Sequence, residues 1–170
     1  LLKEGKFDVI KGNISEIKSI ALGVSSTKGV DASISDIVTK DNVNDVIKFA
    51  QNLSKTTGSI IAITGPIDVI CDTNNAYLCF NGTKDMGKIT GTGWMLGSVI
   101  AAFVASNKDN KLLATVHAIA AVGLCGEIAS KNSKGTGTLR VNLIDAMSNL
   151  TDEQLEKGAK IESRSTLTCL

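Results

Sequence analysis

The chain has 170 residues, 43% of them hydrophobic, which is enough to build the sizeable core of a single domain over residues 1–170. Its 18 basic and 17 acidic residues leave a net charge of +1, which argues against a nucleic-acid-binding protein. The apolar stretch from Trp94 to Ala105 is shorter than the roughly 20 residues that cross a bilayer, and charges break up the first residues. We therefore expect a cytoplasmic protein with neither a membrane nor a nucleic-acid partner.

Strands and helices alternate in the first half of the chain. Phe7 to Ile10 is a strand-like run that stops at Gly12, and Asn13 and Glu16 then stand at the N-cap and N3 positions of a helix. The patterns that follow predict a surface loop over 23–36, a helix over 43–53 capped by Asp41, a strand over 59–64, and a hairpin of strands 69–71 and 76–80.

Helices fill the second half. The segments 92–106 and 112–130 are apolar almost all round a helical wheel, so we expect both to be buried with their backbones close together. A third helix is predicted over 140–150, and Thr151 with Gln154 forms a capping box that opens a last one. Residues 163–170 show no pattern.

This order of elements predicts an α/β sandwich, with a mostly parallel sheet and helices on both faces. Such sheets bind ligands at the carboxyl ends of their strands. Three strand ends are rich in polar residues or glycine: Lys11–Asn13, Thr64–Gly65 and Thr90–Gly93.

The turn Thr90 to Gly93 allows two interpretations. Its glycines permit a tight turn, and the amides of the helix that follows favour a negative charge, so a phosphate could bind there. A plain strand-to-helix turn explains the same residues equally well. The spacing fits neither a P-loop nor a dinucleotide-binding fingerprint.

Asn13 and Glu16 also allow two interpretations, which are compatible. Both residues cap a helix, and their oxygen atoms could in addition face a largely hydrated magnesium ion. For His117 a structural role is favoured over catalysis, and Lys84 and Lys88 are more typical of solvated loop lysines than of phosphate ligands. The four cysteines are expected to be reduced and mostly buried: Cys71, Cys79, Cys125 and Cys169.

Four motifs in this order and spacing resemble the hydroxyethylthiazole kinase family of the ribokinase-like superfamily. They are VIKGNISEI (9–17), KGVDAS (28–33), AITGPIDVI (62–70) and KITGTGWMLGSVIAAF (88–103). The resemblance runs from the start of the chain to about Glu162. It implies a ribokinase-like three-layer sandwich that lacks its N-terminal part.

The resemblance also implies ATP- and Mg²⁺-dependent phosphorylation of the primary alcohol of 4-methyl-5-(2-hydroxyethyl)thiazole, in thiamine biosynthesis, by a homotrimer with active sites at subunit boundaries. The site residues that it implies are Lys11 and Thr64 for ATP, Asn13 and Glu16 for magnesium, Gly91 for the substrate, and the amides of Gly91, Thr92, Gly93 and Trp94 as an anion hole.

Trp94 departs from the family pattern. It stands at the catalytic position, where the family ordinarily has cysteine and related kinases have an aspartate base. Indole only donates a hydrogen bond, and its ring either fills the place of the acceptor alcohol or turns away into the core. Two rival functions remain: a non-catalytic nucleotide- or thiazole-binding relative, and a kinase of the same superfamily that acts on another small alcohol.

Overall fold

The structure, a computed structural model, describes residues 5–24 and 35–165. Most of the predicted loop over 23–36, the 28–33 motif and Cys169 lie outside these residues. The chain divides into two compact units, one of Leu1–Leu78 with Glu162–Leu170 and the other of Cys79–Ile161.

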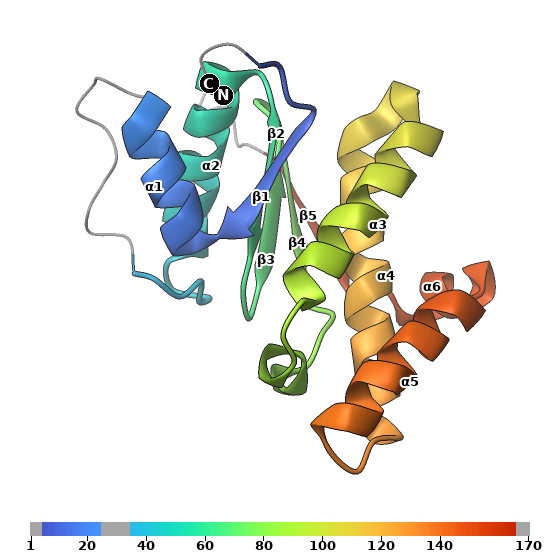
Figure 1. The fold of residues 1–170 in the computed structure, drawn as a ribbon. Helices are drawn as coiled ribbons and strands as arrows, with labels where there is room; N and C mark the ends of the chain where they lie inside the picture. Colours follow the sequence, from blue (N-terminus) through green and yellow to red (C-terminus); the bar gives the residue numbers. More distant parts are fainter. Residues whose placement is uncertain (1–4, 25–34, 166–170) are drawn as a thin grey trace. The chain divides into compact units, whose positions relative to one another are not determined.

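The first unit holds most of a five-stranded sheet in the order β1-β2-β3-β4-β5, with helices α1 and α2 (Figure 1). β1 runs parallel to β2, and β2 runs antiparallel to β3. The α/β class is therefore confirmed, but the sheet is mixed rather than mostly parallel as predicted, because the short turn between β2 and β3 reverses the chain direction. The elements are β1 (Val9–Asn13), α1 (Ile14–Val24), α2 (Val43–Thr57), β2 (Ile60–Thr64), β3 (Asp68–Cys71), β4 (Asn75–Cys79) and β5 (Ile161–Ser165).

The predicted elements of this unit are found, with one cap misplaced. β2 is apolar and buried along nearly its whole length, and the hairpin of β3 and β4 turns through Asp72, whose amide donates to the Asn75 carbonyl at 3.0 Å. The N-cap of α2 is Asn42, so the prediction of Asp41 was wrong. The Asn42 carboxamide binds the loop before the helix, accepting from the Thr39 amide and donating to the Ile37 carbonyl.

Sequence analysis missed β5. Its residues, Ile-Glu-Ser-Arg-Ser, contain a single apolar side chain, so they show none of the alternation that marks a half-buried strand. The strand pairs at one end of the sheet order. The strand therefore forms through backbone pairing with a neighbouring strand, which the local sequence pattern does not predict.

The second unit is helical (Figure 1). It contains the short 3₁₀ helices η1 (Lys84–Lys88) and η2 (Lys108–Asn110) and the α-helices α3 (Thr92–Ser106), α4 (Lys111–Lys131), α5 (Thr136–Asn149) and α6 (Asp152–Gly158). The predicted capping box opens α6: the Thr151 hydroxyl accepts from the Gln154 amide, and the Gln154 carboxamide accepts from the Thr151 amide.

Of the two apolar helices, only α4 is buried on most sides. In α3 only Ile100 and Val104 are buried, so the prediction that both helices are buried was wrong for α3. The reason is geometric, because a helix packed along one side against α4 covers one stripe, whatever the composition of its other faces.

The segment Lys108–Lys131 is long and apolar enough to span a membrane by length and composition. However, 78% of its most apolar window is buried inside the structure. Core helices of soluble proteins pass the same test, so this segment is weak evidence for a membrane span.

Candidate functional site

The junction of β1 and α1 forms the predicted capping box. The Asn13 carboxamide oxygen accepts from the Glu16 amide, and Glu16 Oε2 accepts from the Asn13 amide, both at 2.8 Å. A Cβ at Gly12 would lie 2.9 Å from Glu16 Oε2 and 3.3 Å from Ile17 Cδ1. Glycine is therefore required here, because the strand passes close under the first turn of its own helix.

Three of the predicted nucleotide and metal residues share one face of the sheet. Asn13 is the register partner of Thr64, and Lys11 is that of Ala62. Gly12 faces α1, so the neighbouring positions, Lys11 and Asn13, belong to the opposite face of the strand. Asn13 ends the strand, and its carboxamide turns back to the first turn of α1. The structure thus brings Lys11, Asn13 and Thr64 to one edge of the sheet, with Glu16 tied to Asn13.

The Asn13–Glu16 pair fits a magnesium ion that keeps most of its water. Glu16 is exposed, and Oε1 has no hydrogen-bond partner among the described residues. The same part of the chain holds no cluster of three or more His, Cys, Asp or Glu side chains that could enclose a metal ion. Mg²⁺ usually keeps several waters and binds through one or two carboxylates, so coordination through water suits this pair.

Asp68, which was not singled out from the sequence, is a buried carboxyl next to Thr64 and Gly65. Its side chain is 9% exposed, and Oδ1 accepts a 2.9 Å hydrogen bond from the Gly65 amide, in the turn that follows Thr64. Burial raises the pKa of Asp68 to about 7, against the lowering effect of the Gly65 hydrogen bond. In the sequence, Asp68 is a charged residue within the apolar run from Ile67 to Ile70, and this interruption could have pointed to it.

The glycine turn lies in the second unit and opens α3. Gly91 is its N-cap, with a left-handed backbone (φ +98°) that glycine adopts without strain. The Met95 amide donates to the Gly91 carbonyl at 3.0 Å, so the amides of Gly91 to Trp94 precede the first hydrogen bond within the helix and lie at its N-terminus. The N-cap residue, Gly91, has no side chain that could cap this end, and the first turn carries no acidic residue. The geometry suits an anion.

Trp94 is 87% exposed in the first turn of α3. The alternative that its ring turns into the core is therefore wrong. The indole ring does not pack in the core, and the residue lies beside the candidate anion site at Gly91.

Segment η1, just before the turn, is fastened to α4. Asp85 accepts from the Ser130 hydroxyl and from the Lys88 ammonium, both at 2.7 Å, and the pKa of its carboxyl lies below the usual value because of Lys88 first and Ser130 second. Lys88 is thus engaged in an ion pair, as expected of a loop lysine. His117 is exposed on α4.

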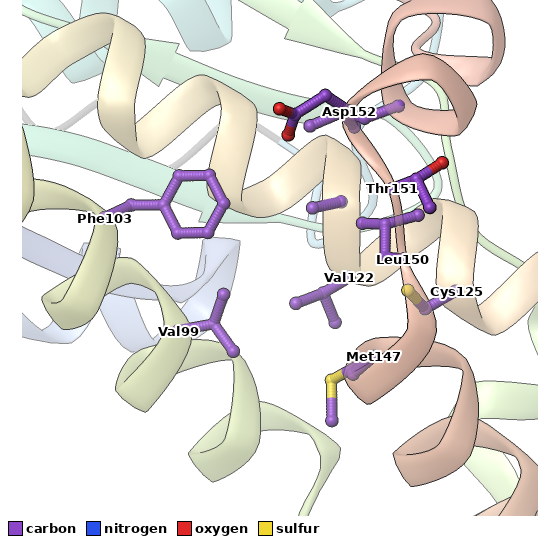
Figure 2. A pocket seen from close by; sticks show the side chains of 10 residues that line it. Val99, Phe103, Val122, Cys125, Met147, Leu150, Thr151 and Asp152 are labelled. Atoms are coloured by element: carbon purple, nitrogen blue, oxygen red, sulfur yellow. The ribbon is translucent and has the colours of Figure 1, made fainter.

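A cavity of about 220 Å³ lies among α3, α4 and the connection between α5 and α6 (Figure 2). Its walls are mainly apolar, with Phe103 and Met147 on opposite sides and Thr151 and Asp152 at one end. Burial raises the pKa of Cys125, which also lines it, to about 11, so this sulfur is a thiol rather than a nucleophile at neutral pH. Within the described part of the chain, Cys71, Cys79 and Cys125 are buried and form no disulfide bond, as predicted.

The fold and these two groups of residues define an α/β protein, with a capping box between β1 and α1 in one unit and a glycine turn at the N-terminus of α3 in the other. A sequence profile of the Hydroxyethylthiazole kinase family matches residues 1–153, and the chain belongs to this family. The resemblance drawn from the four motifs is thereby confirmed.

Individual relatives agree. The chain is 48% identical over 166 residues to a hydroxyethylthiazole kinase of Clostridium acetobutylicum, covering 96% of this chain and 61% of that protein. It is 43% identical over 156 residues to hydroxyethylthiazole kinase 2 of Clostridium botulinum, covering 92% and 58%. The structure of a hydroxyethylthiazole kinase protein from Pyrococcus horikoshii OT3 matches with a TM-score of 0.81 and 26% identity, covering 96% and 57%. The chain spans about three-fifths of the length of these relatives.

Proposed function

We propose that the protein phosphorylates the primary alcohol of 4-methyl-5-(2-hydroxyethyl)thiazole, using ATP and Mg²⁺, in thiamine biosynthesis in the cytoplasm. Family membership and the names of the relatives support the reaction class and the substrate. The observation that carries the proposal is the turn at Gly91, where a left-handed glycine begins α3 and the first-turn amides offer a place for an anion. Residues 1–170 act as one functional domain in this proposal, since the family match spans both units.

Each group of residues has its own task. Lys11 and Thr64 hold ATP at the carboxyl ends of β1 and β2. Asn13 and Glu16 face the hydrated Mg²⁺, which neutralises charge on the phosphates. In the second unit, Gly91 contacts the thiazole alcohol, and the amides of the first turn stabilise the transferred phosphoryl group.

The homotrimer expected from the resemblance, with active sites at its subunit boundaries, is part of this proposal. The exposure of most of α3 leaves an apolar helix surface that such an assembly can cover. Sedimentation of the intact protein measures the number of subunits directly.

Trp94 lowers the rate without abolishing the chemistry. Phosphoryl transfer depends mainly on positioning and electrostatic stabilisation, so the loss of a side-chain base at this position is tolerable. A large exposed ring beside the acceptor alcohol is the greater cost, because it displaces the reacting oxygen.

The test is formation of ADP by the intact protein in the presence of Mg²⁺ and the thiazole alcohol. Turnover that requires this alcohol supports the proposal, and turnover with a different small alcohol in its place supports another acceptor. Calorimetry separates the non-catalytic alternative: binding of ATP or of the thiazole without product, in both the wild type and Trp94→Cys, contradicts a kinase.

A further inference from the structure

A carboxylate buried as deeply as that of Asp68 costs folding free energy unless something compensates for it. The side chain is 9% exposed, and its hydrogen bond within the described residues is the one from the Gly65 amide. Burial raises its pKa to about 7, which shows that this single bond does not offset the loss of water. Residues kept at such a cost are concentrated at functional sites.

Asp68 stands beside Thr64. Ile63 is the register partner of Val69 in the antiparallel pair of β2 and β3, so the next step along the ladder places Thr64 opposite Asp68. Opposite residues in such a pair lie on the same face of the sheet. Asn13, Thr64 and Asp68 therefore form a row across three neighbouring strands, at the edge where β1 and β2 end.

We propose that Asp68 is a positioning residue for the nucleotide, because its carboxylate holds the Gly65 amide and so fixes the backbone at Thr64. This inference rests on the proposed function, in which Thr64 binds ATP. Among the hydrogen bonds of the described residues outside the strand ladder, the one from the Gly65 amide to Asp68 is the one that holds the turn of Gly65, Pro66 and Ile67. Without Asp68 the Gly65 amide is free to reorient toward water.

Closing a turn does not by itself require a buried carboxylate. At the opposite end of β3, Asp72 accepts from the amides of Asn74 and Asn75, at 2.7 and 2.6 Å, while it remains partly exposed. An aspartate that accepts hydrogen bonds from turn amides can therefore hold a turn near the surface, with a smaller desolvation penalty. Asp72 provides a matched control, since it holds a turn at the far end of the same strand.

The experiment compares Asp68→Ala, Asp68→Asn and Asp72→Ala in the intact protein. Calorimetry measures the affinity for a non-hydrolysable ATP analogue with Mg²⁺, and initial rates give KM for ATP, KM for the thiazole alcohol, and kcat. Asp68→Ala should weaken nucleotide binding and raise KM for ATP by about tenfold, the loss expected for one oriented hydrogen bond, with KM for the alcohol changed less than twofold. Asn keeps an acceptor oxygen, so Asp68→Asn should restore most of the affinity.

The outcomes separate this inference from the function on which it rests. If the wild type binds no nucleotide, the proposed function fails. If the wild type binds and Asp68→Ala binds equally well, or Asp72→Ala weakens binding as much, Asp68 has no specific positioning role. A variant Asp68→Asn as weak as Asp68→Ala also overturns the inference, because an acceptor oxygen would then be insufficient.

Discussion

Replacing Asp68 by asparagine should change how the stability of the protein depends on pH. The carboxyl is buried, and its pKa is raised from 3.8 to about 7, first because of desolvation. Since the pKa is raised in the folded state, the folded protein holds this proton more tightly than the unfolded chain does. The stability that the proton contributes is complete below about pH 4 and is lost as pH rises through about 7.

The size of this loss follows from the shift. Each pH unit between the two pKa values removes about 1.4 kcal/mol from the free energy of unfolding. Between pH 5 and pH 8, stability is lost over the two pH units from 5 to the folded-state pKa of about 7, which lowers the free energy of unfolding by about 3 kcal/mol. Asparagine does not titrate and retains an acceptor for the Gly65 amide, so Asp68→Asn lacks this loss.

Urea unfolding followed by circular dichroism at pH 5 and pH 8 measures the difference. The free energy of unfolding of Asp68→Asn minus that of the wild type should rise by about 3 kcal/mol between these pH values. The exposed Asp41 offers a control, and Asp41→Asn should show no comparable change. A difference for Asp68→Asn that stays constant with pH refutes the claim that burial governs this carboxyl.

Three further predictions concern the turn, the cap and the helix packing. Trp94→Cys should raise kcat by up to about 100-fold, because an obstructing ring leaves the acceptor position, while unfolding is almost unchanged, since Trp94 is exposed; an equal kcat means that the ring does not obstruct. Glu16→Gln keeps a capping oxygen at N3 but not the charge, so the free energy of unfolding should stay nearly unchanged. The Mg²⁺ concentration needed for half-maximal rate should rise roughly 10- to 100-fold. An equal Mg²⁺ dependence would show that Glu16 is not part of the metal site. Gly123→Ala would place a Cβ 2.7 Å from the Asn81 backbone and should cost about 1–3 kcal/mol in thermal or urea unfolding. Gly97→Ala meets open space in α3 and should stabilise by about 0.5–1 kcal/mol, and similar effects of the two alanines would contradict the packing described.

Local signals in the sequence predicted the elements that local chemistry determines. The Asn13–Glu16 and Thr151–Gln154 boxes form as their spacing indicates, because capping needs only residues within one turn. The apolar run of β2 likewise marks a strand covered on both faces.

Features set by distant partners were not predictable in this way. The apolar pattern of α3 predicted burial, but how much of a helix is covered depends on its neighbours. β5 carries almost no strand pattern, and the importance of Asp68 emerges only when the register of β2 and β3 places it opposite Thr64. The choice between Asn42 and Asp41 as the cap was decided by contacts to the preceding loop, at Ile37 and Thr39.

The most direct test of the proposed reaction follows the phosphorus atoms themselves. The intact protein and Trp94→Cys are each incubated with ATP, Mg²⁺ and 4-methyl-5-(2-hydroxyethyl)thiazole, and ³¹P NMR records the products. The account predicts one phosphate monoester of the thiazole alcohol for each ADP formed, with faster formation by Trp94→Cys. Unchanged ATP with both proteins, or ADP accompanied only by inorganic phosphate, would contradict it.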